Sequence, residues 1–172
     1  MKSSIQILAG FALFAIPAVV NADCKLNNKI KDDEKTSEDR SELCLAEGPN
    51  KWTFAMQISQ VSVPTFDGSN PFAGISGSKA FIIYDDVCKR AGVYSPDEEG
   101  NDCGIPYVIE EEWLSDKLTV TNINWDVADP FFKFNYAGSE YQTGQGWNIC
   151  SDISSGLRAE QACQATFSNW VE

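Results

Sequence analysis

The clearest alternation of hydrophobic and polar positions starts at Trp52. Trp52, Phe54, Met56 and Ile58 are separated by small or polar residues, and this period of two is typical of a strand with one buried face. The phase of the alternation changes after Gln60, which predicts a bulge or the end of the strand at that point.

A second pattern lies between positions 79 and 107. An apolar run over 79–85 leads into Cys88, a polar loop follows, and another apolar run begins after Cys103. We expect a strand, a loop and a further strand over 105–112. A disulfide between Cys88 and Cys103 would join the two ends of the loop and would stabilise the fold by about 3 kcal/mol in the chain-entropy model.

The rest of the chain contains short alternating segments separated by turn residues. Residues 64–77 are rich in Pro, Gly, Asp, Ser and Asn and are expected to form a loop, and one helical turn is expected over 155–161. Many short strands with turns between them predict an all-β fold, a small disulfide-stapled antiparallel β-barrel or sandwich. Further strands are expected over 118–125, 131–136, 140–143, 147–150 and 162–168.

The first residues have the pattern of a secretory signal peptide. An apolar segment over 5–20 follows Lys2, and Ala22 provides the small residue that a cleavage site needs. The apolar segment is short for a membrane-spanning helix, and no later segment is apolar enough to span a bilayer. We therefore expect residues 1–22 to be removed and the protein to be secreted and extracellular, without membrane insertion.

Residues 23–50 are charged and poor in large apolar side chains. Thr36 or Ser37 would cap a short helix in this segment, and otherwise the segment is a mobile arm or a removable pro-segment. Removal of a signal peptide leaves about 150 residues, the usual size of one domain. We expect a short N-terminal helix or arm over 23–50 and a single β-barrel or sandwich domain over 51–172.

All six cysteines lie after the expected cleavage site. An even number of cysteines in a secreted chain implies three disulfides, and the sequence alone does not choose among the fifteen pairings. The absence of a Cys-x-x-Cys motif and of histidine argues against a metal site. Short spacing favours the pairs Cys24–Cys44, Cys88–Cys103 and Cys150–Cys163.

The chain is acidic, with 25 Asp and Glu residues against 13 Lys and Arg residues and a formal net charge of −12. This charge disfavours binding to nucleic acid and to anionic lipid, and it favours solubility. The sequence contains no histidine, which excludes Ser-His and Cys-His nucleophilic catalysis and nearly every catalytic zinc site. We expect no cofactor and no metal.

Carboxylates remain the main candidates for catalysis. Two of them at a suitable separation suffice for a glycoside hydrolase, and Glu110, Glu112 and Asp85 are the candidates. Strand alternation would place Glu110 and Glu112 on the same face, but a solvated strand edge is the favoured explanation of these acids. The acidic loop over 97–102 has enough oxygen ligands for calcium but lacks the EF-hand spacing, so a solvated loop is favoured.

The chain has five tryptophans. Most are expected in the core, because they lie in segments with strand periodicity. Trp113 lies near a turn and Trp170 lies near the C-terminus, so these two are the candidates for an exposed binding surface. Exposed tryptophans stack on sugar rings or anchor protein partners.

The order of strands and cysteines resembles that of small secreted cysteine-rich fungal proteins, candidate effectors of the major Alternaria allergen-like β-barrel type. The resemblance covers roughly residues 52–167 and depends on cysteine spacing and strand order. The features that carry it are Lys51-Trp52 with the alternating strand, the pair Cys88 and Cys103, and the pair Cys150 and Cys163.

The resemblance implies a non-enzymatic effector-like protein that binds a host or extracellular protein and modulates defence. In that family an unpaired N-terminal cysteine supports dimerisation, whereas Cys24 and Cys44 can close on each other here, so a monomer or weak dimer is expected. The alternative function is a carbohydrate-binding protein or a carboxylate-dependent glycoside hydrolase.

Overall fold

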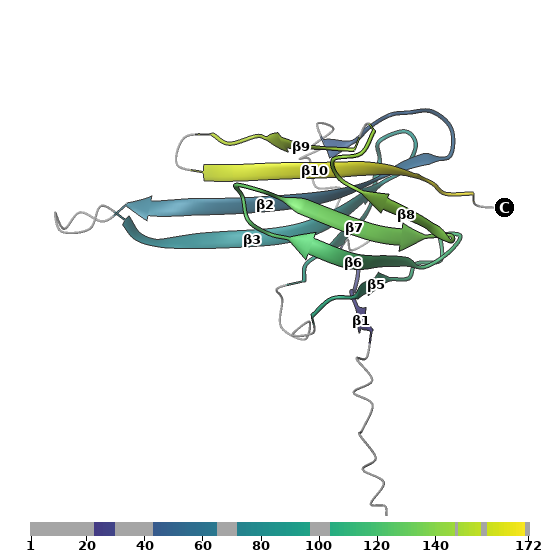
Figure 1. Ribbon diagram of the computed structural model, residues 1–172, viewed down its shortest axis with the longest axis horizontal. Helices are drawn as coiled ribbons and strands as arrows, with labels where there is room; N and C mark the ends of the chain where they lie inside the picture. Colours follow the sequence, from purple (N-terminus) through teal and green to yellow (C-terminus); the bar gives the residue numbers. More distant parts are fainter. Residues whose placement is uncertain are drawn as a thin grey trace, which may run out of the picture.

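The computed structural model describes residues 23–29, 43–64, 72–96, 104–146, 148–155 and 158–170. These residues form ten β-strands and no α-helix, which confirms the predicted all-β class. The strands make two five-stranded sheets that are not closed into a barrel and pack as a sandwich (Figure 1). The expected signal peptide and the expected helix start at Thr36 or Ser37 lie outside the described residues.

One sheet contains the long strands and is called the long-strand sheet here. All its neighbouring strands are antiparallel, in the order β4-β3-β2-β10-β9. β2 pairs with β3 without a break from Thr53 to Val63, so the bulge or strand end expected after Gln60 is wrong, and the register shifts only between Val63 and Pro64. The strands are β2 (Lys51–Pro64), β3 (Phe72–Tyr84), β4 (Arg90–Tyr94), β9 (Ile149–Asp152) and β10 (Arg158–Ser168).

The other sheet, the short-strand sheet, has the order β1-β5-β6-β7-β8. β1 pairs with β5 in parallel, and the remaining pairs are antiparallel. The start of the segment expected to be a charged arm is thus a sheet strand. The strands are β1 (Cys24–Lys25), β5 (Tyr107–Ile109), β6 (Leu118–Asn124), β7 (Phe131–Tyr136) and β8 (Ser139–Gln142).

An aromatic cluster between the sheets forms the centre of the core. The Phe54 ring lies 5.2 Å from the Phe81 ring within the long-strand sheet. It also lies 5.3 Å from the Phe132 ring and 5.0 Å from the Phe134 ring, both on β7 of the other sheet. Full burial of such a side chain stabilises a fold by roughly 1.5–3 kcal/mol, so Phe54 is a principal contact between the two sheets.

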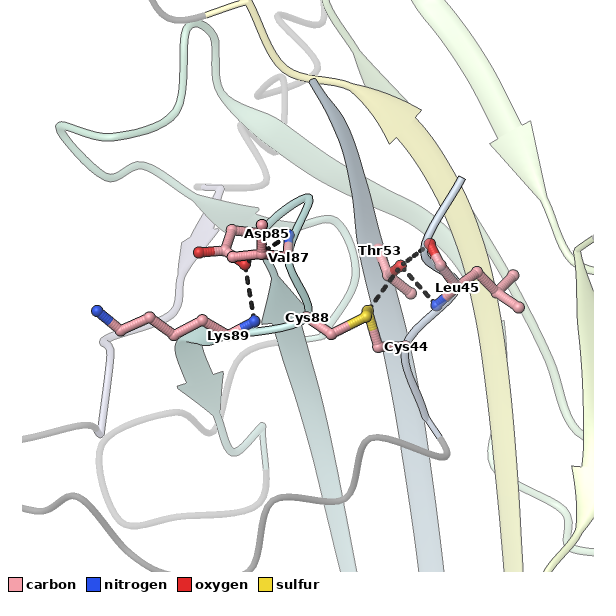
Figure 2. Close-up of a disulfide and its surroundings, with 7 residues drawn as sticks. All are labelled: Cys44, Leu45, Thr53, Asp85, Val87, Cys88 and Lys89. Atoms are coloured by element: carbon pink, nitrogen blue, oxygen red, sulfur yellow. Dashed lines mark hydrogen bonds between the residues drawn. A yellow bond between two sulfur atoms is a disulfide. The ribbon is translucent and has the colours of Figure 1, made fainter. Parts of the chain in front are cut away.

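The outer face of the long-strand sheet is also covered. Leu43 packs there against a second cluster of buried residues that includes Ala55, Ile82 and Tyr84. The central strands are therefore buried on both faces, unlike the half-buried strand that alternation predicts. The covering segment is held by a disulfide from Cys44 to Cys88, whose surroundings are shown in Figure 2.

Thr53 fastens the same segment to β2. Its side chain is buried, and Oγ1 donates to the carbonyl oxygen of Leu45 (3.2 Å) while accepting from the Leu45 amide (3.0 Å). These two hydrogen bonds place residues 43–45 along the sheet and bring Cys44 within reach of the turn that carries Cys88.

The disulfides differ in part from the expected set. Cys150–Cys163 is confirmed and joins two paired residues of β9 and β10. The pairs Cys24–Cys44 and Cys88–Cys103 are wrong, because Cys44 bonds to Cys88. Cys24 is disulfide-bonded to a partner outside the described residues.

The segment from 79 to 107 is not a single hairpin. β3 turns into β4, which lies within the stretch expected to be a loop, whereas β5 belongs to the short-strand sheet. Cys88 lies in the β3–β4 turn beside the outer face, where Cys44 is its neighbour. The short spacing between Cys88 and Cys103 did not predict the disulfide partner of Cys88, because the chain crosses to the other sheet after β4.

Strands β3 and β10 extend into two segments that were expected to be a loop and a helical turn. The loop expected over 64–77 is occupied from Phe72 by β3, and residues 65–71 lie outside the described part. The helical turn expected over 155–161 is wrong, because β10 begins at Arg158 and pairs with β2 along its whole length. Pairing with a central strand overrides weak local propensity here.

Removal of either described disulfide is expected to destabilise the protein, and the Cys44–Cys88 bond should matter more. The chain-entropy model gives about 4 kcal/mol for a separation of 44 residues and about 3 kcal/mol for one of 13. Urea unfolding of Cys44→Ala/Cys88→Ala and Cys150→Ala/Cys163→Ala checks this order.

Non-reducing peptide mapping of the wild-type protein is the control for this experiment. It should recover Cys44 with Cys88 and Cys150 with Cys163. Recovery of Cys88 bonded to Cys103 would contradict the arrangement of the outer face.

Candidate binding site at the tryptophan end

Four segments that are far apart in the sequence meet at one end of the sandwich, which we call the tryptophan end. It is the end at which β10 finishes, on the right of Figure 1. β2 and β6 begin there, and β3 ends there. The segments are residues 45–50, 85–89, 110–117 and 168–170.

Asn169 holds these segments together through a buried hydrogen-bond network. Its side chain is only 1% exposed. Nδ2 donates to the carbonyl oxygen of Trp113 (3.0 Å), and Oδ1 accepts from the Ser115 amide (3.0 Å) and from the Tyr136 hydroxyl. Each polar atom of the amide has a partner, so the network fixes the loop between β5 and β6 without leaving an unsatisfied group.

Asn50 joins the β3–β4 turn to the same network. Its amide donates to Oδ2 of Asp86 (3.0 Å), and its carbonyl oxygen accepts from the Asn169 amide (3.0 Å). Asn50 has a φ of 59°, a left-handed conformation that asparagine tolerates better than most residues. Val87, which follows Asp86, is 76% exposed and is therefore presented on an anchored turn.

The tryptophans differ in the contacts that their rings make with other side chains. Trp113 is half-buried and stacks on Trp52, with 5.4 Å between the ring centroids. Trp125 has the Lys79 Nζ atom 5.5 Å from its ring centroid. Trp170 is 65% exposed and is the one tryptophan in the described part of the chain that makes no ring or cation contact.

Both tryptophans proposed from the sequence as binding residues thus lie at this end. Trp170 is exposed as expected. Trp113 is more buried than expected, because the Trp52 ring covers it and because Asn169 fixes its carbonyl group. Their separation in sequence gave no indication that they would share one end of the molecule.

Asp85, a candidate carboxylate for glycoside hydrolysis, has a structural role. Its Oδ1 accepts from the amides of Val87 (3.1 Å) and Lys89 (2.7 Å), and these bonds close the turn that leads into β4 (Figure 2). An aspartate that accepts from amides further along a turn is a familiar turn-former. This carboxylate is therefore engaged by the backbone.

Glu110 and Glu112 follow the end of β5, so strand alternation does not place them on a shared face. Glu110 forms an exposed ion pair with Lys25 (2.8 Å), and the hydrogen bond and charge of Lys25 lower the pKa of its carboxyl group. A catalytic acid of a glycosidase needs a raised pKa, so this shift is in the wrong direction for that role. Glu112 is exposed.

Tyr94 and Glu111 form a partly buried contact that the sequence pattern did not reveal. The Tyr94 hydroxyl donates to Oε1 of Glu111 (3.0 Å), which ties β4 to the loop after β5. The ring lies over Gly92, where an added Cβ would be 2.5 Å from the hydroxyl oxygen. The spacing of Gly92 and Tyr94 is the signal that could have indicated a strand in the presumed loop.

Neither a metal cluster nor a membrane helix is found in the described part of the chain. It has no group of three or more His, Cys, Asp or Glu residues that could hold a metal ion. It likewise has no helix that is both long and apolar enough to cross a membrane. The acidic loop over 97–102 lies outside the described residues.

Comparison of the chain with protein-family models, curated proteins and solved structures found no match. The resemblance to Alternaria allergen-like proteins therefore stays a prediction.

Replacement of Asn169 should loosen the tryptophan end. Asn169→Ala leaves the Trp113 carbonyl, the Ser115 amide and the buried Tyr136 hydroxyl with fewer partners, at a cost of about 1–3 kcal/mol in the free energy of unfolding. Urea unfolding measures this loss. Asn135→Ala, at an exposed position on β7, is the control and should change stability by less than about 0.5 kcal/mol.

Tyr94 is expected to make stability fall at alkaline pH. Burial, followed by the charge of Glu111 and the hydrogen bond to it, raises the Tyr94 pKa above its ordinary value. The neutral form is favoured in the folded state, so this contribution is complete below about pH 10 and is lost as pH rises further. Urea unfolding across this range should show a smaller alkaline loss for Tyr94→Phe than for wild type, and equal losses would refute the assignment.

Proposed function

We propose that the protein is a secreted, non-enzymatic, effector-like protein that binds a host or extracellular protein through the tryptophan end and thereby modulates defence. The exposure of Trp170 is the observation that carries the location of the binding surface. The effector part of the proposal rests on the resemblance described above. The two described disulfides are compatible with an extracellular protein.

Trp170 has the features of an anchor in a protein interface. Tryptophan is enriched among residues that contribute most to binding energy, and such residues are effective when the backbone beneath them is already ordered. Asn169 supplies that order, because its backbone amide binds Asn50 and its side chain binds the loop over 113–115 and the Tyr136 hydroxyl. Exposed Val87 adds an apolar side chain at the same end.

The roles of the carboxylates support a binding protein over a glycosidase. Asp85 is engaged in a turn, and the pKa of Glu110 is lowered rather than raised. A carbohydrate-binding function is the second candidate, because an exposed tryptophan near a stacked pair also suits a sugar ring.

A binding array of purified extracellular host proteins tests the proposal. We expect at least one protein to bind wild type and to bind Trp170→Ala about tenfold more weakly, as is usual for a central aromatic anchor. Ile105→Ala is the matched control, because Ile105 is also exposed (43%) but precedes β5, away from the tryptophan end. This variant should bind like wild type.

An array of cell-wall oligosaccharides, measured in parallel, separates the two candidate functions. Binding of a sugar that is lost in Trp170→Ala, with no protein bound, would favour the carbohydrate-binding alternative. Release of reducing sugar that Glu110→Gln or Glu112→Gln abolishes would establish an enzyme instead. Absence of any protein that depends on Trp170 would contradict the proposal.

A further inference from the structure

We propose that the tryptophan end recognises a cationic segment of its protein partner, with an arginine side chain placed on the Trp170 ring and beside the Glu112 carboxylate. This inference rests on the proposed function and specifies the chemistry of the partner. It follows from the charge of this end, from the state of each tryptophan ring and from the position of Glu112.

The tryptophan end carries more acidic than basic side chains. Its described segments contain seven Asp or Glu residues and two Lys residues. The whole chain has a formal net charge of −12, so the local charge adds to a long-range field that attracts cationic partners. The acids are Glu47, Asp85, Asp86, Glu110, Glu111, Glu112 and Asp116, and the bases are Lys89 and Lys117.

Most of these acids already have specific partners. Asp85 and Asp86 accept from backbone amides, Glu110 binds Lys25, and Glu111 accepts from Tyr94. Glu112 is exposed, and within the described residues it has no hydrogen bond or ion pair. It is therefore the carboxylate at this end that is available to a partner.

One hydrogen bond links the backbone beside Glu112 to the residue that precedes Trp170. Nδ2 of Asn169 donates to the carbonyl oxygen of Trp113. Glu112 directly precedes Trp113 in the chain, and Trp170 directly follows Asn169. An exposed ring and an available carboxylate are thus presented by the same buried network.

The chain itself shows what kind of group a tryptophan ring attracts here. The Lys79 ammonium group lies over Trp125, whereas the ring of Trp170 has no such contact within the described residues. Arginine fits the site better than lysine because its planar guanidinium stacks on an indole and binds a carboxylate through two N–H groups. A neutral sugar would use the ring but not the charge.

The test uses a short peptide that alternates arginine with glycine, and the same peptide with citrulline in place of arginine. Citrulline keeps the shape of the side chain and removes its charge. We expect the arginine peptide to bind the full protein, with a change in tryptophan fluorescence, and the citrulline peptide to bind at least tenfold more weakly. Binding should weaken from about 0.01 M to about 0.15 M salt, as the Debye length falls from about 30 to about 8 Å.

Variants locate the binding. Glu112→Lys and Trp170→Ala should each weaken binding of the arginine peptide about tenfold. Asp129→Lys makes the same change in charge at an exposed position in the turn between β6 and β7, at the opposite end of β6, and should weaken it by less than about twofold. Equal weakening by Glu112→Lys and Asp129→Lys would mean non-specific attraction and would overturn the inference.

Failure of this inference can be told apart from failure of the proposed function. If binding of a protein partner is lost in Trp170→Ala but is unaffected by Glu112→Lys and by salt, the partner contacts the aromatic surface alone. The assignment of a cationic partner is then wrong. Absence of arginine-peptide binding, or equal binding of the citrulline peptide, overturns the assignment in the same way.

Discussion

The packing of Phe54 between the two sheets is the contact on which the other features depend. It joins β2, the central strand of the long-strand sheet, to β7 in the opposite sheet. Because β2 pairs with β3 on one side and with β10 on the other, the contacts of Phe54 place all three strands against the opposite sheet. The tryptophan end is the place at which these strand ends meet, so its geometry follows from the core.

The second constraint is that the long-strand sheet has no free face at its centre. Ala55, Ile82 and Tyr84 point away from the sandwich and require a cover, which Leu43 supplies. A segment of so few apolar residues gains little from burial, so it needs a covalent attachment and the hydrogen bonds to Thr53. The Cys44–Cys88 disulfide is thus part of the packing, because it holds the cover on the sheet.

Sequence patterns predicted the strands whose large side chains alternate. β2, β6 and β7 were found because residues such as Phe132 and Phe134 repeat at a period of two. β4 was missed because glycine takes the place of a large inward side chain at position 92, where the Tyr94 ring needs the space. The disulfide of Cys88 was also missed, because the choice between neighbours in sequence and neighbours across a sheet depends on long-range packing.

The candidate site could be predicted only in its parts. Trp170 was expected to be exposed from its place near the C-terminus, and the neighbouring Asn169 gave no signal. A lone asparagine has no periodicity, and its importance depends on the three segments to which it is hydrogen-bonded. Whether a polar residue near a chain end is solvated or buried is decided by tertiary structure.

Two asparagine side chains at the edges of the sheets affect the tendency of the protein to aggregate at high concentration. Asn28 bonds to Val93 and Ala91 along the edge of β4, and Asn148 bonds to Gln142 and Thr166 between β8 and β10. Each amide occupies backbone groups that an incoming strand would otherwise use. Exposed sheet edges can pair with a strand of another molecule and so promote aggregation. These side chains block that pairing and thereby oppose self-association.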